Sequence, residues 1–334
     1  MTSGGGPVLV TGATGFLGGH LCEALLARGV PVRGLVRGPG SRLPAGVEPA
    51  HAADLLDREA LRRAVAGAEA VVHLAARVHV MRDGAEDPLA EFRRVNVEGT
   101  RVLLEEVVAA GVRSFVFVSS VKAVGEAGTV PWTEATPPHP VDPYGISKLE
   151  AERLVRETAE RAGLHAPILR LPLVYGPGVK GNMLQLFALV DRGIPLPFGA
   201  VANRRSMAFS GNVVAAIEAV LHGPSAGAET FFVSDGRDLA TPELVREVAR
   251  ALGVAPRLLR VPPALLRAAA RAGDAVSRVA PFPLTSAALQ RLTGSLPLDA
   301  SKLGRATGFR PPYTVEEGLR ATAAWYRSGR AARA

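Results

Sequence analysis

Residues 7–19 read PVLVTGATGFLGG, and this stretch decides the fold. Val8–Val10 are apolar and largely β-branched, which is typical of a buried strand. Glycines follow at positions 12, 15 and 18, and leucines then recur at helical spacing, at positions 17, 21 and 25. A strand, a glycine turn and a helix in this order predict the first unit of a dinucleotide-binding sheet, with a pyrophosphate at the helix N-terminus. A glycine-rich turn without a ligand is the alternative, and the flanking strand and helix favour the dinucleotide.

Strand and helix signals alternate up to about residue 173 and then loosen. Further strands are expected at 30–36, just before 53, and at 70–74, 113–119 and 168–171, with helices at 89–110 and 144–161. We therefore expect an α/β fold, with a Rossmann-type doubly wound parallel sheet in residues 1–173. Residues 174–330 are expected to form mainly a smaller, interleaved α/β substrate domain. Some of its segments are expected to return and pack on the Rossmann domain.

The composition is that of a globular protein, since 48% of the 334 residues are hydrophobic and 5% are aromatic. No apolar run approaches the roughly 20 residues needed to cross a bilayer. The N-terminal MTSGGG lacks the basic and apolar regions of a signal peptide. The single cysteine, Cys22, excludes an intrachain disulfide and a cysteine metal cage. A cytoplasmic protein without a metal site is expected.

The positive charge is unevenly distributed. The net charge is +8, and residues 246–334 hold 15 Lys and Arg against 5 Asp and Glu. A basic final quarter suits an anionic substrate, although an Arg-rich solvated face is the alternative. No nucleic-acid motif accompanies the charge, so no nucleic-acid partner is expected. Lysine is rare, which marks each lysine as a place where an amine is needed rather than a guanidinium. The four are Lys122, Lys148, Lys180 and Lys302.

Tyr144 and Lys148 lie four residues apart at the start of a predicted helix, so both project to one face. A free tyrosine has a pKa of about 10, and an adjacent ammonium favours the phenolate. Such a tyrosine can exchange a proton with a sugar or alcohol oxygen while a hydride moves at the attached carbon. Ser120 ends a predicted strand at the same crevice and can hydrogen-bond the reacting oxygen. We predict Ser120, Tyr144 and Lys148 as the catalytic residues.

The second strand indicates the cofactor. In this fold an acidic residue at its end selects NAD, but here the strand ends in Arg37. Because a guanidinium can pair with a 2′-phosphate, NADP(H) is favoured and NAD(H) stays open. Asp54 and Leu55 are expected to meet the adenine. His79 is expected in a loop at the crevice, as a substrate contact or as an ordinary loop residue.

Several motifs together resemble the extended short-chain dehydrogenases/reductases. They are GATGFLG at 12–18, Asp54-Leu55, HLAA at 73–76, Asn96, Ser119-Ser120 and YGISK at 144–148. The resemblance spans essentially the whole chain and is closest to enzymes that act on nucleotide-diphosphate sugars. The predicted cofactor contacts are Gly12, Thr14, Gly15, Phe16, Leu17, Gly18, Arg37, Asp54, Leu55, Leu74, Ala75, Ala76, Asn96, Val118, Tyr144, Lys148, Pro172 and Val174. The predicted substrate contacts are His79, Lys122, Asn182, Arg205 and Arg291, with Arg205 matching the arginine that grips the diphosphate.

Departures from that family narrow the activity. The sugar 4,6-dehydratases carry an Asp-Glu pair where this chain has Val121-Lys122, so 4,6-dehydration is not expected. The run at 119–126 looks most like bacterial reductases of 4-keto nucleotide sugars in surface-polysaccharide pathways. We expect 4-keto reduction ahead of 4-epimerisation of a UDP-hexose with retained NAD. A reductase of a non-sugar ketone, such as a sterol or flavonoid-like compound, is a further alternative.

Two expectations concern partners. The helices at 89–110 and 144–161 carry more apolar surface than one sheet face needs, and the resembled family commonly pairs them, so a homodimer is expected. The helix at 264–280 places arginines between its apolar residues. It is expected to pack as an ordinary helix, with contact to an acidic membrane surface as the less favoured alternative.

Overall fold

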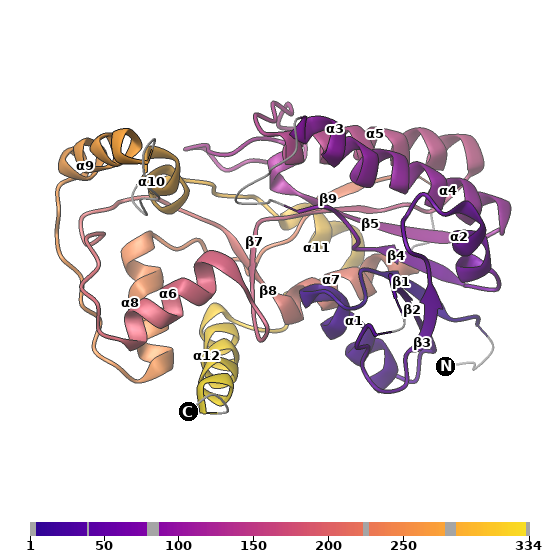
Figure 1. Cartoon of the computed structure of the whole chain (residues 1–334), viewed down its shortest axis with the longest axis horizontal. Helices are drawn as coiled ribbons and strands as arrows, with labels where there is room; N and C mark the ends of the chain where they lie inside the picture. The colour runs from indigo at the N-terminus through magenta and orange to yellow at the C-terminus, as the bar shows by residue number, and fades with distance from the viewer. Residues whose placement is uncertain (1–4, 39, 79–86, 223–226, 278–284, 332–334) are drawn as a thin grey trace.

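The computed structural model describes residues 5–38, 40–78, 87–222, 227–277 and 285–331. Seven parallel strands form one sheet in the order β3-β2-β1-β4-β5-β6-β9 (Figure 1). Their bounds are β1 Val8–Thr11, β2 Val32–Val36, β3 Glu48–His51, β4 Ala70–His73, β5 Ser114–Ser120, β6 Ile168–Leu171 and β9 Thr230–Phe232. The expected doubly wound parallel sheet is confirmed. Its strand order reverses between β1 and β4, and ligands bind at such a switch point, beside the carboxyl ends of the strands.

Helices cover both faces of the sheet and bury its β-branched residues. One face packs against α1 (Phe16–Ala27), α7 (Ser210–Leu221) and α11 (Ser301–Thr307). The other face packs against α2 (Arg58–Val65), α4 (Gly99–Ala109) and α5 (Pro143–Ala162) (Figure 1). The central strands β1 and β4 therefore read as short, fully buried and mainly apolar runs, as expected for a sheet that is buried on both sides.

A second core lies beside the sheet. The short strands β7 (Leu173–Tyr175) and β8 (Met207–Phe209) pair there in parallel. Around them pack α6 (Gly181–Asp191), α8 (Thr241–Leu252) and α12 (Val315–Ala331), while α9 (Pro263–Val276) and α10 (Ser286–Thr293) lie at the far end (Figure 1). Both α7 and β9 follow residue 173, yet β9 is a strand of the large sheet and α7 packs on its face. The division of the chain at residue 173 stays a prediction.

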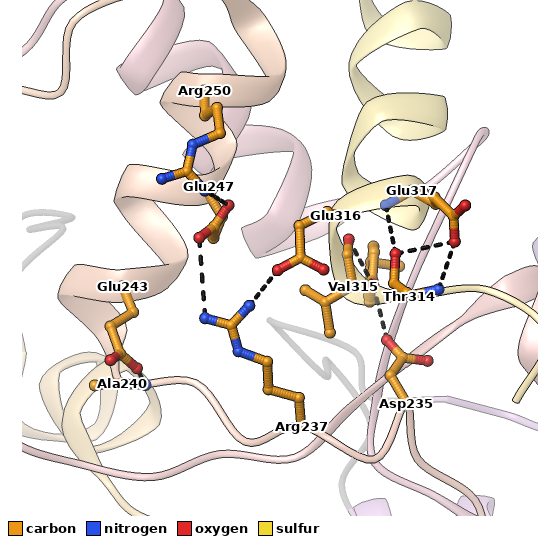
Figure 2. Close-up of polar contacts among 11 residues, drawn as sticks. Asp235, Arg237, Ala240, Glu243, Glu247, Arg250, Thr314, Val315, Glu316 and Glu317 are labelled. Carbon is orange, nitrogen blue, oxygen red and sulfur yellow. Dashed lines mark hydrogen bonds and ion pairs between the residues drawn. The ribbon is translucent and has the colours of Figure 1, made fainter.

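The loop after β9 joins the two cores. The Asp235 carboxylate accepts hydrogen bonds from Tyr175 Oη and from Phe209 N, both at 2.7 Å. Two residues later, Arg237 lies between Glu247 of α8, at 4.0 Å, and Glu316 of α12 (Figure 2). Through this loop, the end of β9 in the large sheet is tied to β7, β8, α8 and α12 of the second core.

The predicted helix at 89–110 is not one α-helix. It divides into α3 (Pro88–Arg93), a π-helical turn η1 (Arg94–Glu98) and α4. Asn96 lies in the π turn, and its side chain is used for contacts with other parts of the chain, described below. A π turn inserts one residue into the helix, which rotates a side chain away from the regular helical spacing. Hydrophobic periodicity alone did not predict this break.

The helix predicted at 264–280 is α9, which the structure describes as far as Val276. Leu265 and Val276 are exposed on it, at 61% and 47%. Among the described residues, no helix combines the length and apolar character needed to cross a membrane.

Candidate active site

The turn between β1 and α1 forms a cradle that fits a dinucleotide. Gly12 has φ +71°, and a Cβ there would lie 2.9 Å from the Ala75 backbone nitrogen. At Gly18 a Cβ would lie 2.1 Å from the Gly12 carbonyl oxygen. Only glycine therefore allows the turn, the helix and the end of β4 to approach this closely. The N-terminus of α1 has no side-chain cap, so its first amides can bind a phosphate.

The other predicted cofactor residues surround this cradle or approach it. Thr14 and Gly15 are exposed in the turn, and Leu74, Ala75 and Ala76 continue from β4 opposite them. Thr11 Oγ1 accepts a hydrogen bond from the Ala75 amide at 3.1 Å, which fixes the two strand ends together. Pro172 and Val174 lie where the chain passes from β6 into β7. These segments meet at the carboxyl end of the sheet.

At the predicted adenosine end, the two charged residues differ in their surroundings. Arg37 is exposed just beyond β2. Asp54 follows β3, and its Oδ2 accepts a hydrogen bond from Arg94 Nη1 at 2.8 Å. The hydrogen bond from Arg94 lowers the pKa of Asp54. Leu55 packs against Gly99, where a Cβ would lie 2.8 Å from the leucine side chain.

Asn96 connects the end of β4 with the helix that carries the predicted catalytic pair. Its Oδ1 accepts from the Arg77 amide at 2.8 Å, and its Nδ2 donates to the Arg77 carbonyl at 3.0 Å and to Ser147 Oγ at 2.9 Å. Ser147 is the neighbour of Lys148. The carboxamide therefore holds the end of β4 and the start of α5 together, and its predicted contact with the cofactor stays a prediction.

Tyr144 stands in the first turn of α5, next to the end of β5. Its ring meets the Phe92 ring edge-on, with the two ring centres 6.0 Å apart. Burial raises the pKa of Tyr144 to about 12, while Ser120 acts to lower it. Without a further positive charge nearby, the phenol therefore keeps its proton at neutral pH.

Lys148 lies one helical turn after Tyr144 and is 3% exposed. Its Nζ donates to the Val118 carbonyl at 2.7 Å and lies 4.0 Å from the centre of the Phe117 ring. Burial lowers the pKa of Lys148 to about 7, while Glu152 acts to raise it. Its ammonium charge therefore depends on the pH near neutrality and on the groups around it.

The predicted substrate contact Lys122 has carboxylate partners within the protein. Its Nζ donates to Glu126 Oε1 at 2.9 Å and also to Asp142 Oδ2. Asp142 is the N-cap of α5, and its other oxygen accepts from the Gly145 amide at 2.6 Å. Sequence reasoning missed Glu126 and Asp142. An Asp directly before Pro143 at a helix start was a signal that could have identified the cap.

The structure brings Arg205 and Arg291 together. The Arg205 guanidinium donates to the Arg291 carbonyl on α10. Burial lowers the pKa of Arg205, and Glu126 acts in the opposite sense. Asn182 is exposed in the first turn of α6. His79 lies outside the described residues, and within them no three His, Cys, Asp or Glu side chains group to hold a metal ion.

Comparison with known proteins decides the family. Residues 8–233 match the NAD dependent epimerase/dehydratase family. The chain belongs to that family. It is 36% identical to a Vibrio cholerae UDP-glucose 4-epimerase over 325 residues, covering 95% of this chain and 94% of the relative. This confirms the resemblance to extended short-chain dehydrogenases/reductases and identifies the chain as an enzyme of the NAD dependent epimerase/dehydratase family.

Two further relatives cover nearly the whole chain. An Escherichia coli O157:H7 protein named N-acetyl-alpha-D-glucosaminyl-diphospho-ditrans,octacis-undecaprenol 4-epimerase is 31% identical over 316 residues, covering 93% of this chain and 92% of that protein. The crystal structure of a Thermus thermophilus UDP-glucose 4-epimerase in complex with NAD is 30% identical, with a TM-score of 0.72, covering 96% of this chain and 99% of that one. The family thus includes enzymes named for sugars attached to diphosphates.

Proposed function

We propose that this enzyme transfers a hydride at C4 of a nucleotide-diphosphate sugar, with Tyr144 as the proton donor and acceptor. The observation that carries the proposal is the meeting of Ser120, Tyr144 and the buried Lys148 where β5 ends and α5 begins. That point lies at the carboxyl edge of the sheet, beside the switch point where the glycine cradle lies. The protein therefore offers a place for a sugar carbon next to a nicotinamide.

Each residue has a chemical task. Tyr144 Oη exchanges a proton with the sugar 4-oxygen, and Ser120 shares a hydrogen bond with the same oxygen. A charged Lys148 stabilises the phenolate form of Tyr144, whose pKa burial otherwise holds at about 12. The bound nicotinamide supplies the hydride acceptor and donor. Residues 12–18 would hold the dinucleotide, and the uncapped first amides of α1 would bind its pyrophosphate.

Two outcomes of this chemistry are distinguished by the fate of the hydride. The relatives named as 4-epimerases favour 4-epimerisation, in which the hydride returns to the same carbon. The absence of an acid at the end of β2 favours an exchangeable NADP(H) and net reduction of a 4-keto sugar. We place 4-epimerisation first, because the similarity to these relatives covers nearly the whole chain, and 4-keto reduction second.

A substrate panel tests the proposal. The purified enzyme is incubated with UDP-glucose and NAD, and separately with a 4-keto dTDP-sugar and NADH or NADPH. Formation of the C4 epimer without net cofactor reduction identifies an epimerase, whereas oxidation of NAD(P)H that requires the ketone identifies a reductase. An undecaprenyl-diphosphate sugar joins the panel because one relative is named for such a substrate. No turnover of any of these, with the cofactor bound, would contradict the proposal.

Tyr144→Phe is the matched control for every reaction in the panel. It removes one oxygen and keeps the ring against Phe92. Turnover should fall by roughly three orders of magnitude or more, while cofactor affinity stays nearly unchanged. If turnover of the variant stays near that of the wild type, Tyr144 is not the proton donor and acceptor.

We also propose a homodimer built on α4 and α5, which lie side by side on the outside of the sheet (Figure 1). Sedimentation that finds only monomer at micromolar concentration would contradict the homodimer.

For α9 we propose an ordinary packed helix, because Leu266, Ala270 and Gly273 bury one face. Flotation with anionic liposomes would instead support the membrane contact.

A further inference from the structure

A buried ion pair lies behind Lys148 and takes no part in the proton transfer proposed above. Glu152 follows Lys148 by one turn of α5, and Arg170 projects from β6. Arg170 Nε and Nη2 donate to the two Glu152 oxygens at 2.9 and 2.7 Å. The side chains are 0% and 3% exposed for Glu152 and Arg170. Sequence reasoning singled out neither the pair nor its position.

The Glu152 carboxylate is fully used. Besides both contacts from Arg170, Oε1 accepts from Ser119 Oγ at 2.6 Å and Oε2 accepts from Arg156 Nη2 at 3.2 Å. Ser119 and Val118 are neighbours on β5, so one strand holds both the Lys148 ammonium and the Glu152 carboxylate. The positions of the Lys148 and Glu152 side chains are therefore both fixed by β5, the strand that ends at Ser120.

Stability alone does not explain this arrangement. A buried ion pair is often no more stable than apolar side chains of the same volume, because both charges lose their hydration. Here Arg170 Nη1 is also buried without a hydrogen-bond partner in the described part of the chain, which adds a desolvation cost. The pair is therefore better understood through its effect on the neighbouring ammonium.

None of the other charged groups described around Lys148 could take over the stabilisation of its ammonium by Glu152. His73 of β4 is fully buried between Thr11 and Thr100, and burial lowers its pKa to about 3, so it is neutral. On the outer side of α5, Glu150 is paired with Arg93 of α3. Near Tyr144, the Asp142 carboxylate is paired with Lys122 of the turn η2 (Val121–Ala123). Glu152 is the buried carboxylate on the Lys148 side of the helix.

We propose that Glu152, fixed by Arg170 and Ser119, is a positioning residue that favours the charged form of Lys148 and holds its ammonium in place one helical turn from Tyr144. Two side chains four residues apart on a helix lie roughly 5–6 Å apart at Cβ, close enough for a strong charge effect where water is excluded. The opposing influences of burial and of Glu152 on the Lys148 pKa agree with this role. The inference rests on the role proposed for Lys148 in catalysis.

The low number of lysines makes a direct test available. With lysine labelled at ¹³Cε, four side-chain signals are expected, and the Lys148→Met variant identifies the one that belongs to Lys148. The pH midpoint of that signal is measured by NMR in the wild type and in Glu152→Gln. Removing one unit charge at this separation should lower the midpoint by about one pH unit or more. This measurement needs no substrate. The role of Glu152 can therefore be disproved while the proposed function stands, and the proposed function can be disproved while the role of Glu152 stands.

A second variant covers the case in which Glu152→Gln does not fold. Arg170→Met leaves the Glu152 carboxylate with Ser119 and Arg156 and removes the compensating positive charge. It should therefore move the Lys148 midpoint to higher pH. The control is Glu150→Gln, two residues earlier on the outer side of α5, which should leave the midpoint where it is.

Two results would overturn the proposal. One is a folded Glu152→Gln variant in which Lys148 titrates as in the wild type. The other is an Arg170→Met variant that fails to raise the midpoint, which would identify the pair as a packing element only. Glu152→Asp, which restores the charge on a shorter stem, should recover part of the shift.

Discussion

Lys122 binds the Asp142 carboxylate that caps the helix of Tyr144. Although burial acts to lower it, the pKa of Lys122 is raised by its hydrogen bonds to Asp142 and Glu126. The charge of Asp142 in turn acts to raise the pKa of Tyr144. Lys122 thus compensates a negative charge two residues from the proposed acid, and its position near Ser120 is explained without a substrate contact.

Lys122→Met distinguishes positioning from substrate binding. If Lys122 acts through Asp142 and Tyr144, we expect kcat to fall by about tenfold with KM nearly unchanged, because only the transition state needs the tuned phenol. A raised KM with unchanged kcat would restore the substrate contact predicted from the sequence. Lys302→Met is the control, since that amine binds the Thr230 carbonyl and Glu229 beneath β9.

We expect Lys148 to lower the free energy of unfolding of the protein near neutral pH. Its pKa is about 7 in the folded chain and about 10.4 in an unfolded one. Between these values the unfolded chain binds a proton that the folded chain does not, so this group makes stability rise with pH and fall as pH decreases toward 7. At pH 7 this pKa difference lowers the free energy of unfolding by several kcal/mol. The hydrogen bond from Lys148 to the Val118 carbonyl stabilises the fold by less than that.

Lys148→Met should therefore abolish turnover and raise the melting temperature at about pH 7, with a smaller gain at about pH 9.5. Thermal unfolding followed by circular dichroism at the two pH values measures the difference. A variant that is less stable than the wild type at both values would show that the amine is held in the folded chain as a stabilising charge.

Arg37 decides the cofactor preference in our interpretation. Arg37→Ala should weaken NADPH binding by roughly tenfold or more, the loss of one charge-assisted contact, and leave NADH affinity nearly the same. Arg63→Ala is the control, because Arg63 is an exposed cation paired with Glu59 on α2. Tightly bound NAD in the purified protein, or equal losses for both cofactors, would favour the NAD use seen in the Thermus thermophilus structure.

The features that could be predicted from the sequence are those that a short stretch of residues determines by itself. The first six parallel strands along the chain that enter the large sheet, the glycine turn and the start of α5 depend on residues that are close in sequence, and each was predicted near its observed bounds, whereas β9 was not predicted. The π turn at Asn96 depends on the Arg77 backbone and on Ser147, which are 19 and 51 residues away. Likewise, Glu152 and Arg170 meet only after β5 and β6 pair. Such contacts require the three-dimensional arrangement and leave no periodic pattern in the chain.

Arg205 provides the test of substrate class. A bidentate guanidinium matches the oxygens of a diphosphate, and the residue lies beside α10 and within the electrostatic influence of Glu126, which itself binds Lys122 near Tyr144. If Arg205 grips a diphosphate, Arg205→Ala should raise KM for the sugar nucleotide by about 10–100-fold with little change in melting temperature. The rival interpretation is structural, since the same guanidinium donates to the Arg291 carbonyl and so ties β8 and its preceding loop to α10. In that case the melting temperature should fall while KM stays the same, and the non-sugar ketone alternative would reopen. Arg204→Ala is the control, because that neighbour is exposed and pairs with Asp238 at 2.9 Å.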